Sequence, residues 1–286
     1  QDVELIDRLE DKMKLLELAI TMSYDAKVNF EDVYSQVRMW DTMIYNYLTD
    51  RNVVVPPRRV ERKDEKYAGA YVKEPKAGCY DWVVSFDLNS LYPHLIMQYN
   101  ISPETLIESR HPSATVDKIL EGKLDISGEY CVCANGAQYR KDIHGFLPEM
   151  MQTIYDERTI YKKKMLIAKQ DYEKKPSEEL KKNIAKFNNI QMARKIQLNS
   201  AYGAIGNQYF RYYNLANAEA ITLSGQVSIR WIEQRMNKYL NKILKTEDED
   251  YVIASDTDSI YLNLGPLVET VYKGREKTPS SIVSFL

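Results

Sequence analysis

The sequence predicts an α/β protein in which long helices and antiparallel strand pairs occur in one chain. Several stretches repeat apolar residues every three to four positions, which is typical of amphipathic helices, whereas short β-like runs end at turn-forming residues. With 286 residues, of which 44% are hydrophobic, the chain has enough apolar surface for one large core or two modest ones. This composition excludes wholesale disorder.

Two amphipathic helices are predicted in the first 50 residues. Apolar positions recur from Leu5 to Ile20 and again from Val33 to Tyr47, so we expect both segments to serve packing and not chemistry. The polar stretch at 51–66 contains a Pro-Pro pair and a cluster of Arg and Lys, which predicts a linker.

Short β-like runs follow the linker. The runs at 70–72 and 81–86 lead to Asp87, and Leu88–Gln98 has the spacing of a helix. Asn135-Gly136, between two further runs, is a strong hairpin turn signal, whereas residues 108–128 carry no usable signal.

The middle of the chain predicts two long helices, at about 149–173 and 178–202. Ser177 is a natural N-cap of the second helix, and the short connection predicts an antiparallel helical hairpin. A further helix from about Leu215 to Leu244 leads into a strand hairpin at Tyr251–Leu264.

Composition limits the possible partners. No apolar run is long enough to span a membrane and the N-terminal residues do not resemble a secretory signal, so we expect a soluble, intracellular protein without a membrane partner. The net charge is only −2, but the segment Arg158–Lys195 holds 12 Lys or Arg and 4 acidic residues, a local charge of +8. Such asymmetry is expected where one lobe meets phosphates, although charge alone favours a solvated helical face.

Carboxylates in two segments are candidates for chemistry. Asp87 follows the run VVSF, while Asp256 and Asp258 lie in a D-T-D turn between YVIA and SIYL. Nucleotidyl transfer needs two carboxylates that hold a pair of Mg²⁺ ions about 4 Å apart, one ion for the attacking hydroxyl and one for the leaving pyrophosphate. We predict Asp87 and Asp258 as these ligands, although each aspartate alone also fits an ordinary turn residue.

Cations on the helical hairpin complete a site for a triphosphate. Lys195, Asn199 and Tyr202 are spaced i, i+4 and i+7 and share one helical face, and Arg158 and Lys162 share a face of the preceding helix. If the hairpin folds back on itself, both faces can present cations to one nucleotide. The pair on the first helix, taken alone, also fits a salt-bridging surface.

Three motifs in this order resemble those of the family B DNA polymerases, most closely the branch found in T-even-type bacteriophages. They are D-x-x-S-L-Y-P at Asp87–Pro93, K-x-x-x-N-S-x-Y-G at Lys195–Gly203 and D-T-D-S at Asp256–Ser259. The resemblance continues through GAYVKEP at Gly69–Pro75 and GNQYFRYY at Gly206–Tyr213, so it covers nearly the whole chain.

The resemblance implies a role for each matching residue. Asp87 and Asp258 would be the catalytic metal ligands for two Mg²⁺ ions, with Asp256 as the supporting carboxylate. The remaining implied residues are the triphosphate-contacting backbone of Leu88, Asn89, Ser90 and Leu91, the steric gate Tyr92, the phosphate-gripping Arg158, Lys162 and Lys195, the nucleotide-aligning Asn199, and Tyr202 and Gly203 beside the nascent base pair.

The resemblance also implies an organisation: a helical remnant of an exonuclease region (1–50), the linker (51–66), a first part of an antiparallel-sheet palm (67–148), a helical fingers hairpin (149–203) and a second part of the palm (204–286). We expect the later palm and the thumb to be absent after Leu286. Asp2 resembles the last metal ligand of the exonuclease, whose earlier acidic motifs are missing, so proofreading is not expected.

Some positions depart from the family pattern. Ala254-Ser255 replaces the usual Tyr-Gly before D-T-D, and His94 stands where a small hydroxyl residue is common. The sequence thus predicts part of a DNA polymerase that acts on a primer-template and deoxynucleoside triphosphates in the cytoplasm of an infected bacterial host. The alternatives are a non-catalytic nucleotide- or DNA-binding fragment, or one part of a split polymerase that needs a second chain.

Overall fold

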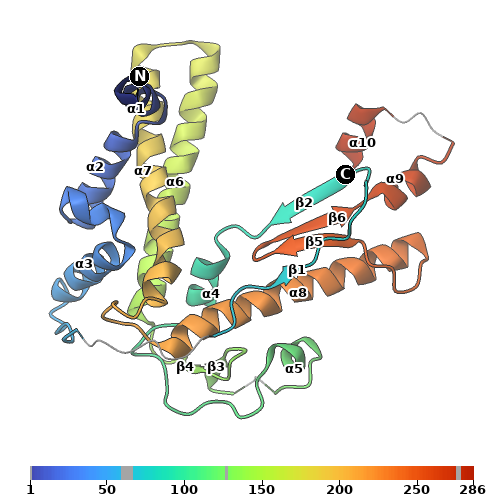
Figure 1. Cartoon of the computed structure of the whole chain (residues 1–286), viewed down its shortest axis with the longest axis horizontal. Coiled ribbons are helices and arrows are strands. Elements are labelled where there is room, and N and C mark those ends of the chain that lie inside the picture. Colours follow the sequence, from blue (N-terminus) through green and yellow to red (C-terminus); the bar gives the residue numbers. More distant parts are fainter. Residues whose placement is uncertain (1, 59–66, 126–127, 275–277) are drawn as a thin grey trace.

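The computed structural model describes residues 2–58, 67–125, 128–274 and 278–286. Its two largest parts are a sheet lined by α8 (Leu215–Leu244) and an upright helical hairpin of α6 (Phe146–Lys174) and α7 (Glu178–Ile205) (Figure 1). Helix α4 (Leu91–Tyr99) lies where the two parts meet and contacts α6, α7 and α8. Among the described residues no helix has the length and apolar character needed to cross a membrane.

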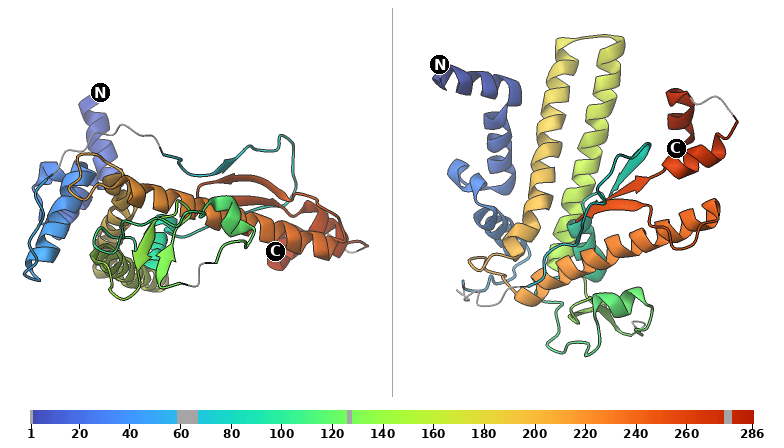
Figure 2. Two further views of the ribbon diagram at one scale, coloured as in Figure 1. Left: turned by 90° about the horizontal axis from the view of Figure 1, so that it is seen from below. Right: turned by 45° about the vertical axis from the view of Figure 1, so that its right-hand side comes forward.

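The main sheet is antiparallel, with strand order β1-β5-β6-β2. Its strands are β1 (Val72–Lys73), β5 (Val252–Asp256), β6 (Ser259–Asn263) and β2 (Val83–Asp87). Helix α8 runs along one face of the sheet (Figures 1 and 2), where its Ile229 and Leu240 join the buried cluster of Val252 and Ile260. The predicted bounds of α8 and the predicted hairpin of β5 and β6 are confirmed.

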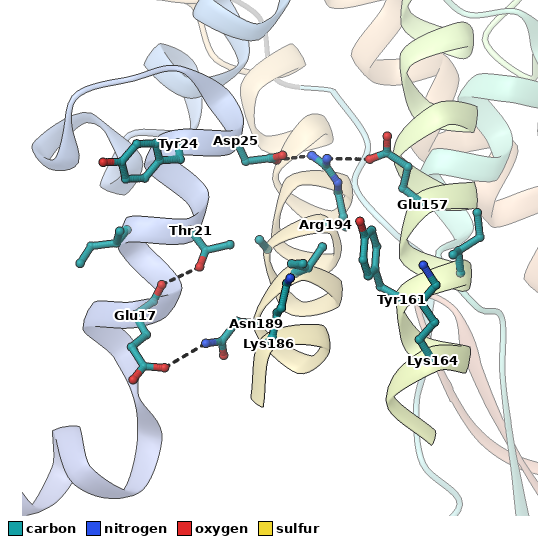
Figure 3. Close-up of a pocket in the computed structure, with 14 residues that line it drawn as sticks. Glu17, Thr21, Tyr24, Asp25, Glu157, Tyr161, Lys164, Lys186, Asn189 and Arg194 are labelled. Atoms are coloured by element: carbon teal, nitrogen blue, oxygen red, sulfur yellow. Dashed lines mark hydrogen bonds and ion pairs between the residues drawn. The ribbon is translucent and has the colours of Figure 1, made fainter. Parts of the chain in front are cut away.

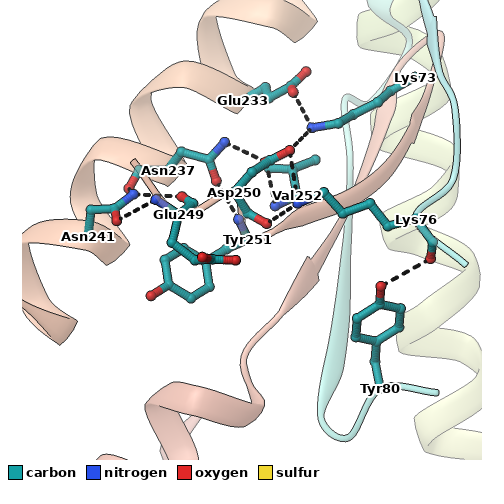
Figure 4. A network of polar contacts seen from close by, with 10 residues as sticks. All are labelled: Lys73, Lys76, Tyr80, Glu233, Asn237, Asn241, Glu249, Asp250, Tyr251 and Val252. Carbon is teal, nitrogen blue, oxygen red and sulfur yellow. Dashed lines mark hydrogen bonds and ion pairs between the residues drawn. The ribbon is translucent and has the colours of Figure 1, made fainter. Parts of the chain in front are cut away.

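A polar network fastens β1 and the start of β5 to α8 (Figure 4). The ammonium of Lys73 donates to Glu233 on α8 and, at 2.7 Å, to Asp250; Asn237 Nδ2 donates to the other oxygen of Asp250 at 2.7 Å. Burial alone would raise the pKa of Asp250, but the hydrogen bonds from Lys73 and Asn237 outweigh it and lower the pKa. The network therefore stabilises the sheet only while these carboxylates are charged.

The helical hairpin forms as predicted, with each helix three residues longer at the end next to the sheet. The hydroxyl of Ser177 caps α7 by accepting from the amide of Leu180 at 3.2 Å. At the end next to the sheet the hairpin shares its core with α3 (Gln36–Thr49), whose buried Trp40 donates from Nε1 to the carbonyl of Gln197 at 3.2 Å.

The predicted helix from Leu5 to Ile20 is broken. Lys14 adopts a left-handed conformation (φ 52°) and separates α1 (Asp2–Met13) from α2 (Leu15–Ala26). Helix α2 packs on α7, whereas none of the residues of α1 is buried, so the packing prediction is wrong for α1. The second predicted helix is also divided, because the 3-10 helix η1 (Phe30–Tyr34) precedes α3 and its N-cap Ser35.

Other differences are local. Helix α4 begins at Leu91, and not at Leu88, because Leu88–Ser90 form a loop in which Ser90 has a φ of 55°. The predicted Asn135-Gly136 turn joins β3 (Tyr130–Val132) to β4 (Gln138–Arg140). Sequence patterns missed α5 (Val116–Leu120), α9 (Gly265–Val271) and α10 (Pro279–Phe285). Positions 51–58 of the predicted linker are irregular, and positions 59–66 lie outside the described residues.

We predict that Lys73→Met lowers the free energy of unfolding by about 2 kcal/mol at pH 7, because two partly buried carboxylates lose their shared counter-ion. The side chains of Lys73 and Glu233 are both only 14% exposed. Since the pKa of Asp250 is lowered in the folded state, its contribution is present above the ordinary value of 3.8 and is lost as the pH falls through the folded value. The deficit of the variant should therefore shrink in acid.

Chemical denaturation at pH 7 and pH 3 measures both effects. The matched control is Lys76→Met, because Lys76 is 40% exposed and lies 3.3 Å from the same carboxylate. Equal losses for the two variants, or a deficit for Lys73→Met that grows in acid, would contradict the prediction.

Candidate active site

Two aspartates meet at one end of the β2–β6 pair. Asp87 is the last residue of β2 and is paired in register with Ser259, the first residue of β6. The amide of Leu88 then donates to the carbonyl of Asp258 at 2.7 Å. The backbone thus places Asp87 and Asp258 at the same end of the β2–β6 pair, as the sequence pattern predicts.

The D-T-D segment is a tight two-residue hairpin turn. The amide of Asp258 donates to the carbonyl of Asp256 at 2.6 Å, and Thr257 has a φ of 53°. A β-branched residue rarely adopts this left-handed conformation, so the surrounding contacts must hold it. One of them is the bond from the Thr257 amide to the carbonyl of Tyr71, at 3.0 Å. The turn therefore presents Asp258 on a fixed backbone.

A cavity of about 480 Å³ opens beside the two aspartates. Its walls come from the end of β2, the loop before α4, the D-T-D turn and both helices of the hairpin. The lining residues are Asp87, Asn89, Ser90, Leu91, Tyr92, Pro93, Arg158, Lys195, Asn199, Thr257 and Asp258. Residues from all three sequence motifs therefore share one cavity.

Two cations, Arg158 and Lys195, line the same cavity as the aspartates. Arg158 Nη1 donates to the hydroxyl of Ser90 at 3.3 Å, while its buried Nε has no hydrogen-bond partner among the described residues. Lys195 is exposed and lies one helical turn before Asn199. The side chain of Ser90 does not cap α4, so the first amides of this helix remain available to an anion.

The ring of Tyr92 forms another wall, and two further tyrosines lie behind it. The ring of Tyr92 lies 4.7 Å from that of Tyr202, centroid to centroid, and the hydroxyl of Tyr202 is 2.9 Å from that of Tyr67. A Cβ atom on Gly225 would approach Tyr92 Cε1 to 3.2 Å, so α8 can pass this ring closely only because Gly225 lacks a side chain. Burial, followed by nearby negative charge, raises the pKa of Tyr92, which keeps its phenol neutral.

Five predicted site residues do not line the cavity. Leu88 instead lines an adjoining apolar cavity below Asp87. Asp256 is exposed and accepts from the hydroxyl of Thr257 at 2.8 Å, and Lys162 is exposed one turn beyond Arg158. Tyr202 reaches the site through Tyr92. The fifth residue, Gly203, faces Gln36 of α3, whose Oε1 would lie 2.0 Å from an added Cβ.

Sequence reasoning did not single out Thr257 and Pro93, which line the cavity. Both residues lie inside the motifs at 87–93 and 256–259, and this position could have marked them as site residues. The roles of all these residues stay predictions, because position in a cavity does not establish chemistry.

The two aspartates fit Mg²⁺ by their donor chemistry. Burial, and then the negative charge of Asp87, raises the pKa of Asp258 above its ordinary value of 3.8. A cation would relieve this repulsion, and Mg²⁺ characteristically takes one or two carboxylates and completes its shell with water and phosphate oxygens. No group of three or more His, Cys, Asp or Glu side chains suited to a metal occurs within the described ranges.

Volume alone does not identify the site. A larger cavity of about 880 Å³ lies between α2 and the hairpin, and Figure 3 shows Arg194 reaching both Asp25 and Glu157 there. Arg194 lies 2.6 Å from Glu157 and forms an ion pair with Asp25 as well. Its charge is therefore already matched, in contrast to the cations beside Asp87.

Comparisons with known proteins agree with the motifs. A profile of DNA polymerase family B matches residues 29–274. The whole chain is 34% identical to a DNA-directed DNA polymerase of Escherichia phage RB69 and 35% identical to one of Enterobacteria phage T4, and it spans 36% of the length of each. The solved family B DNA polymerase of the archaeon Pyrobaculum calidifontis has a TM-score of 0.59 and 27% identity, over 93% of this chain and 31% of that one.

We predict that Asp87→Asn raises the free energy of unfolding by about 0.5 to 1 kcal/mol at pH 7 in EDTA, because it removes a like charge beside Asp258. The folded-state pKa of Asp258 is raised above 3.8, so its carboxyl costs stability as the pH rises through this region. The gain should therefore appear near neutral pH and vanish at pH 3.

Denaturant titrations at both pH values test this sign. Asp81→Asn is the matched control, since Asp81 is an exposed aspartate just before β2 and outside the cavity. A variant with Asp87→Asn that is less stable than the wild type at pH 7 would show that the two carboxylates do not repel one another.

Proposed function

Because the chain belongs to DNA polymerase family B, we propose that it is the palm and fingers portion of a template-directed DNA polymerase. The reaction is the addition of deoxynucleoside triphosphates to the 3′-hydroxyl of a primer. The supporting observation is the shared cavity, in which the paired aspartates Asp87 and Asp258 and the cations Arg158 and Lys195 occur together. Carboxylates that hold metal ions, together with cations that bind phosphate, are typical of enzymes that transfer phosphoryl or nucleotidyl groups.

Asp87 and Asp258 would hold two Mg²⁺ ions. When bound, such ions activate the attacking hydroxyl and neutralise charge on the leaving pyrophosphate. The contribution of the chain is to fix both carboxylates on one strand end and one tight turn, so that little reorganisation is needed when the ions bind. Asp256 would support the turn from outside the cavity.

The triphosphate would lie between the hairpin and the N-terminus of α4. Arg158 offers a fork of donors that suits phosphate oxygens, and Lys195 offers a mobile point charge. The first amides of α4, with Leu88–Leu91 before and at the helix start, would bind phosphate oxygens from the other side. Lys162, further along α6, would meet the phosphates from the solvent side.

Sugar and base would be placed by the aromatic wall. Tyr92 would lie under the sugar and exclude a ribose 2′-hydroxyl, because its ring is confined between Tyr202 and Gly225. Asn199 would align the nucleotide, and Tyr202 with Gly203 would border the nascent base pair. A ring held from two sides cannot move aside cheaply for an extra hydroxyl.

The macromolecular partner would be a DNA primer-template, inside the cytoplasm of an infected bacterial host. The +8 segment of the hairpin supports contact with phosphates, which supply most sequence-independent DNA affinity. These 286 residues span 36% of the length of the two phage relatives, so we expect weak activity or none from this stretch by itself. The alternatives are a non-catalytic nucleotide- or DNA-binding fragment and one part of a split polymerase that a second chain completes.

Lys195→Ala should weaken binding of Mg²⁺–dATP by about tenfold or more, because a charge-assisted phosphate contact is worth about 1.5 to 3 kcal/mol. Calorimetric titration of the chain measures this affinity. Lys186→Ala, which removes an exposed lysine from the same helix outside the cavity, is the control and should bind as the wild type does. Equal affinities for all three proteins would remove Lys195 from the site.

Primer extension tests the proposed reaction. With Mg²⁺ and four deoxynucleotides we expect little or no extension by the 286 residues alone, and extension after addition of a polypeptide that supplies the remainder of a phage relative. Asp258→Ala should abolish that activity and serves as the blank. Processive extension by the chain alone would contradict the expected weakness. No extension even with the added polypeptide would favour the non-catalytic alternative.

A further inference from the structure

Two side chains brace the loop before α4 from outside the cavity. The ring of His94, on α4, and that of Tyr155, on α6, lie 4.6 Å apart between centroids, with an interplanar angle of 81°. This edge-to-face contact joins the hairpin to the sheet part of the molecule, 61 residues away in sequence. Neither residue lines the cavity.

Each of the two residues also bonds a residue that does line the cavity. Asn89 Nδ2 donates to the hydroxyl of Tyr155 at 3.3 Å. His94 Nδ1 lies 2.9 Å from the carbonyl oxygen of Ser90, which can only accept, so the nitrogen is the donor. The loop at 89–90 needs these contacts, because Ser90 adopts a left-handed conformation (φ 55°) that is unfavourable for a residue other than glycine.

We infer that Tyr155 and His94 are positioning residues for the triphosphate: together they hold the 89–90 loop at a fixed distance from Arg158. Tyr155 precedes Arg158 by three residues, so both lie on the same face of α6, one turn apart. Tyr155 contacts Asn89 where Arg158 contacts Ser90. Adjacent contacts of one helix with one short loop set the width of the phosphate site.

If Tyr155 and His94 served only the stability of the fold, their substitution would lower stability more than nucleotide affinity. Tyr155 and His94 are only half-buried and Asn89 is exposed, and Tyr155 packs against the core without being one of its buried residues. Loss of the ring contact should therefore alter nucleotide affinity more than stability. The inference rests on the proposed function, since it concerns the nucleotide triphosphate of that site.

Titration with Mg²⁺–dATP, paired with chemical denaturation of each variant, tests the inference. Tyr155→Leu and His94→Ala should each weaken binding by about threefold to tenfold, the range expected for loss of an aromatic pair. The double variant should lose less than the sum of the two single losses, because each single variant already removes the shared ring contact. Tyr155→Phe keeps the ring and should lose about twofold at most.

Tyr161→Leu is the matched control, because Tyr161 is a tyrosine of the same helix that packs on Phe187 of the hairpin and not on the loop. It should bind the nucleotide as the wild type does. Should Tyr155→Leu fail to fold, the comparison of His94→Ala with Tyr155→Phe carries the same test.

The outcomes separate the two proposals. A wild-type chain that binds no Mg²⁺–dATP overturns the proposed function and this inference with it. A wild-type chain that binds, with Tyr155→Leu and His94→Ala equally tight, overturns only the inference. It is also overturned if Tyr161→Leu loses as much affinity, or if the losses of the single variants simply add.

Discussion

The antiparallel pairing of β2 with β6 is the constraint from which the site follows. Its register sets Asp87 opposite Ser259, and the bond from the Leu88 amide to Asp258 closes the strand end against the turn. Because side chains alternate across a strand, a slip of one residue would send Asp87 to the other face. The same bond keeps Leu88 out of α4, which leaves the loop and the uncapped helix start facing the cavity. The same strand pairing therefore positions both the aspartates and the start of α4 beside the cavity.

Charged side chains are paired where they fasten elements of the fold together, but the two aspartates of the cavity are not. Lys73 neutralises Glu233 and Asp250 beneath the sheet, where partnered charges fasten β1 and β5 to α8. Arg194 does the same between α2 and the hairpin. By contrast, Asp87 at the end of β2 and Asp258 in the neighbouring turn repel one another. Burial adds to the free-energy cost of the charge on Asp258. The surrounding framework must therefore be stable enough to hold like charges together, which is typical of sites that act on charged ligands.

Sequence patterns predicted the elements whose signals are local, and they failed where distant contacts decide. Strong periodicity located α8 and the hairpin, and sequence reasoning named nine of the eleven cavity residues, eight of them within the short motifs and Arg158 on the preceding helix. The spacing of Leu88, Leu91 and Leu95 fits a helix, yet a bond to a residue 170 positions away holds Leu88 in a loop. The break at Lys14 interrupts an apolar pattern that itself continues unchanged. The pairing of His94 with Tyr155 depends on how two helices meet, which spacing within either helix does not contain.

The length of the hairpin makes it a lever. Helix α6 has 29 residues, so it extends about 43 Å from its start at Phe146, whereas Arg158 lies only about 18 Å along it. A tilt of about 10° at the base would move the far end by about 7 Å but Arg158 by about 3 Å. A force applied at the far end therefore acts on the contacts of Arg158 multiplied by about two, the ratio of the two distances from the base. A small force on the lysine-rich connection between α6 and α7 therefore produces a larger force at the loop where Arg158 contacts Ser90.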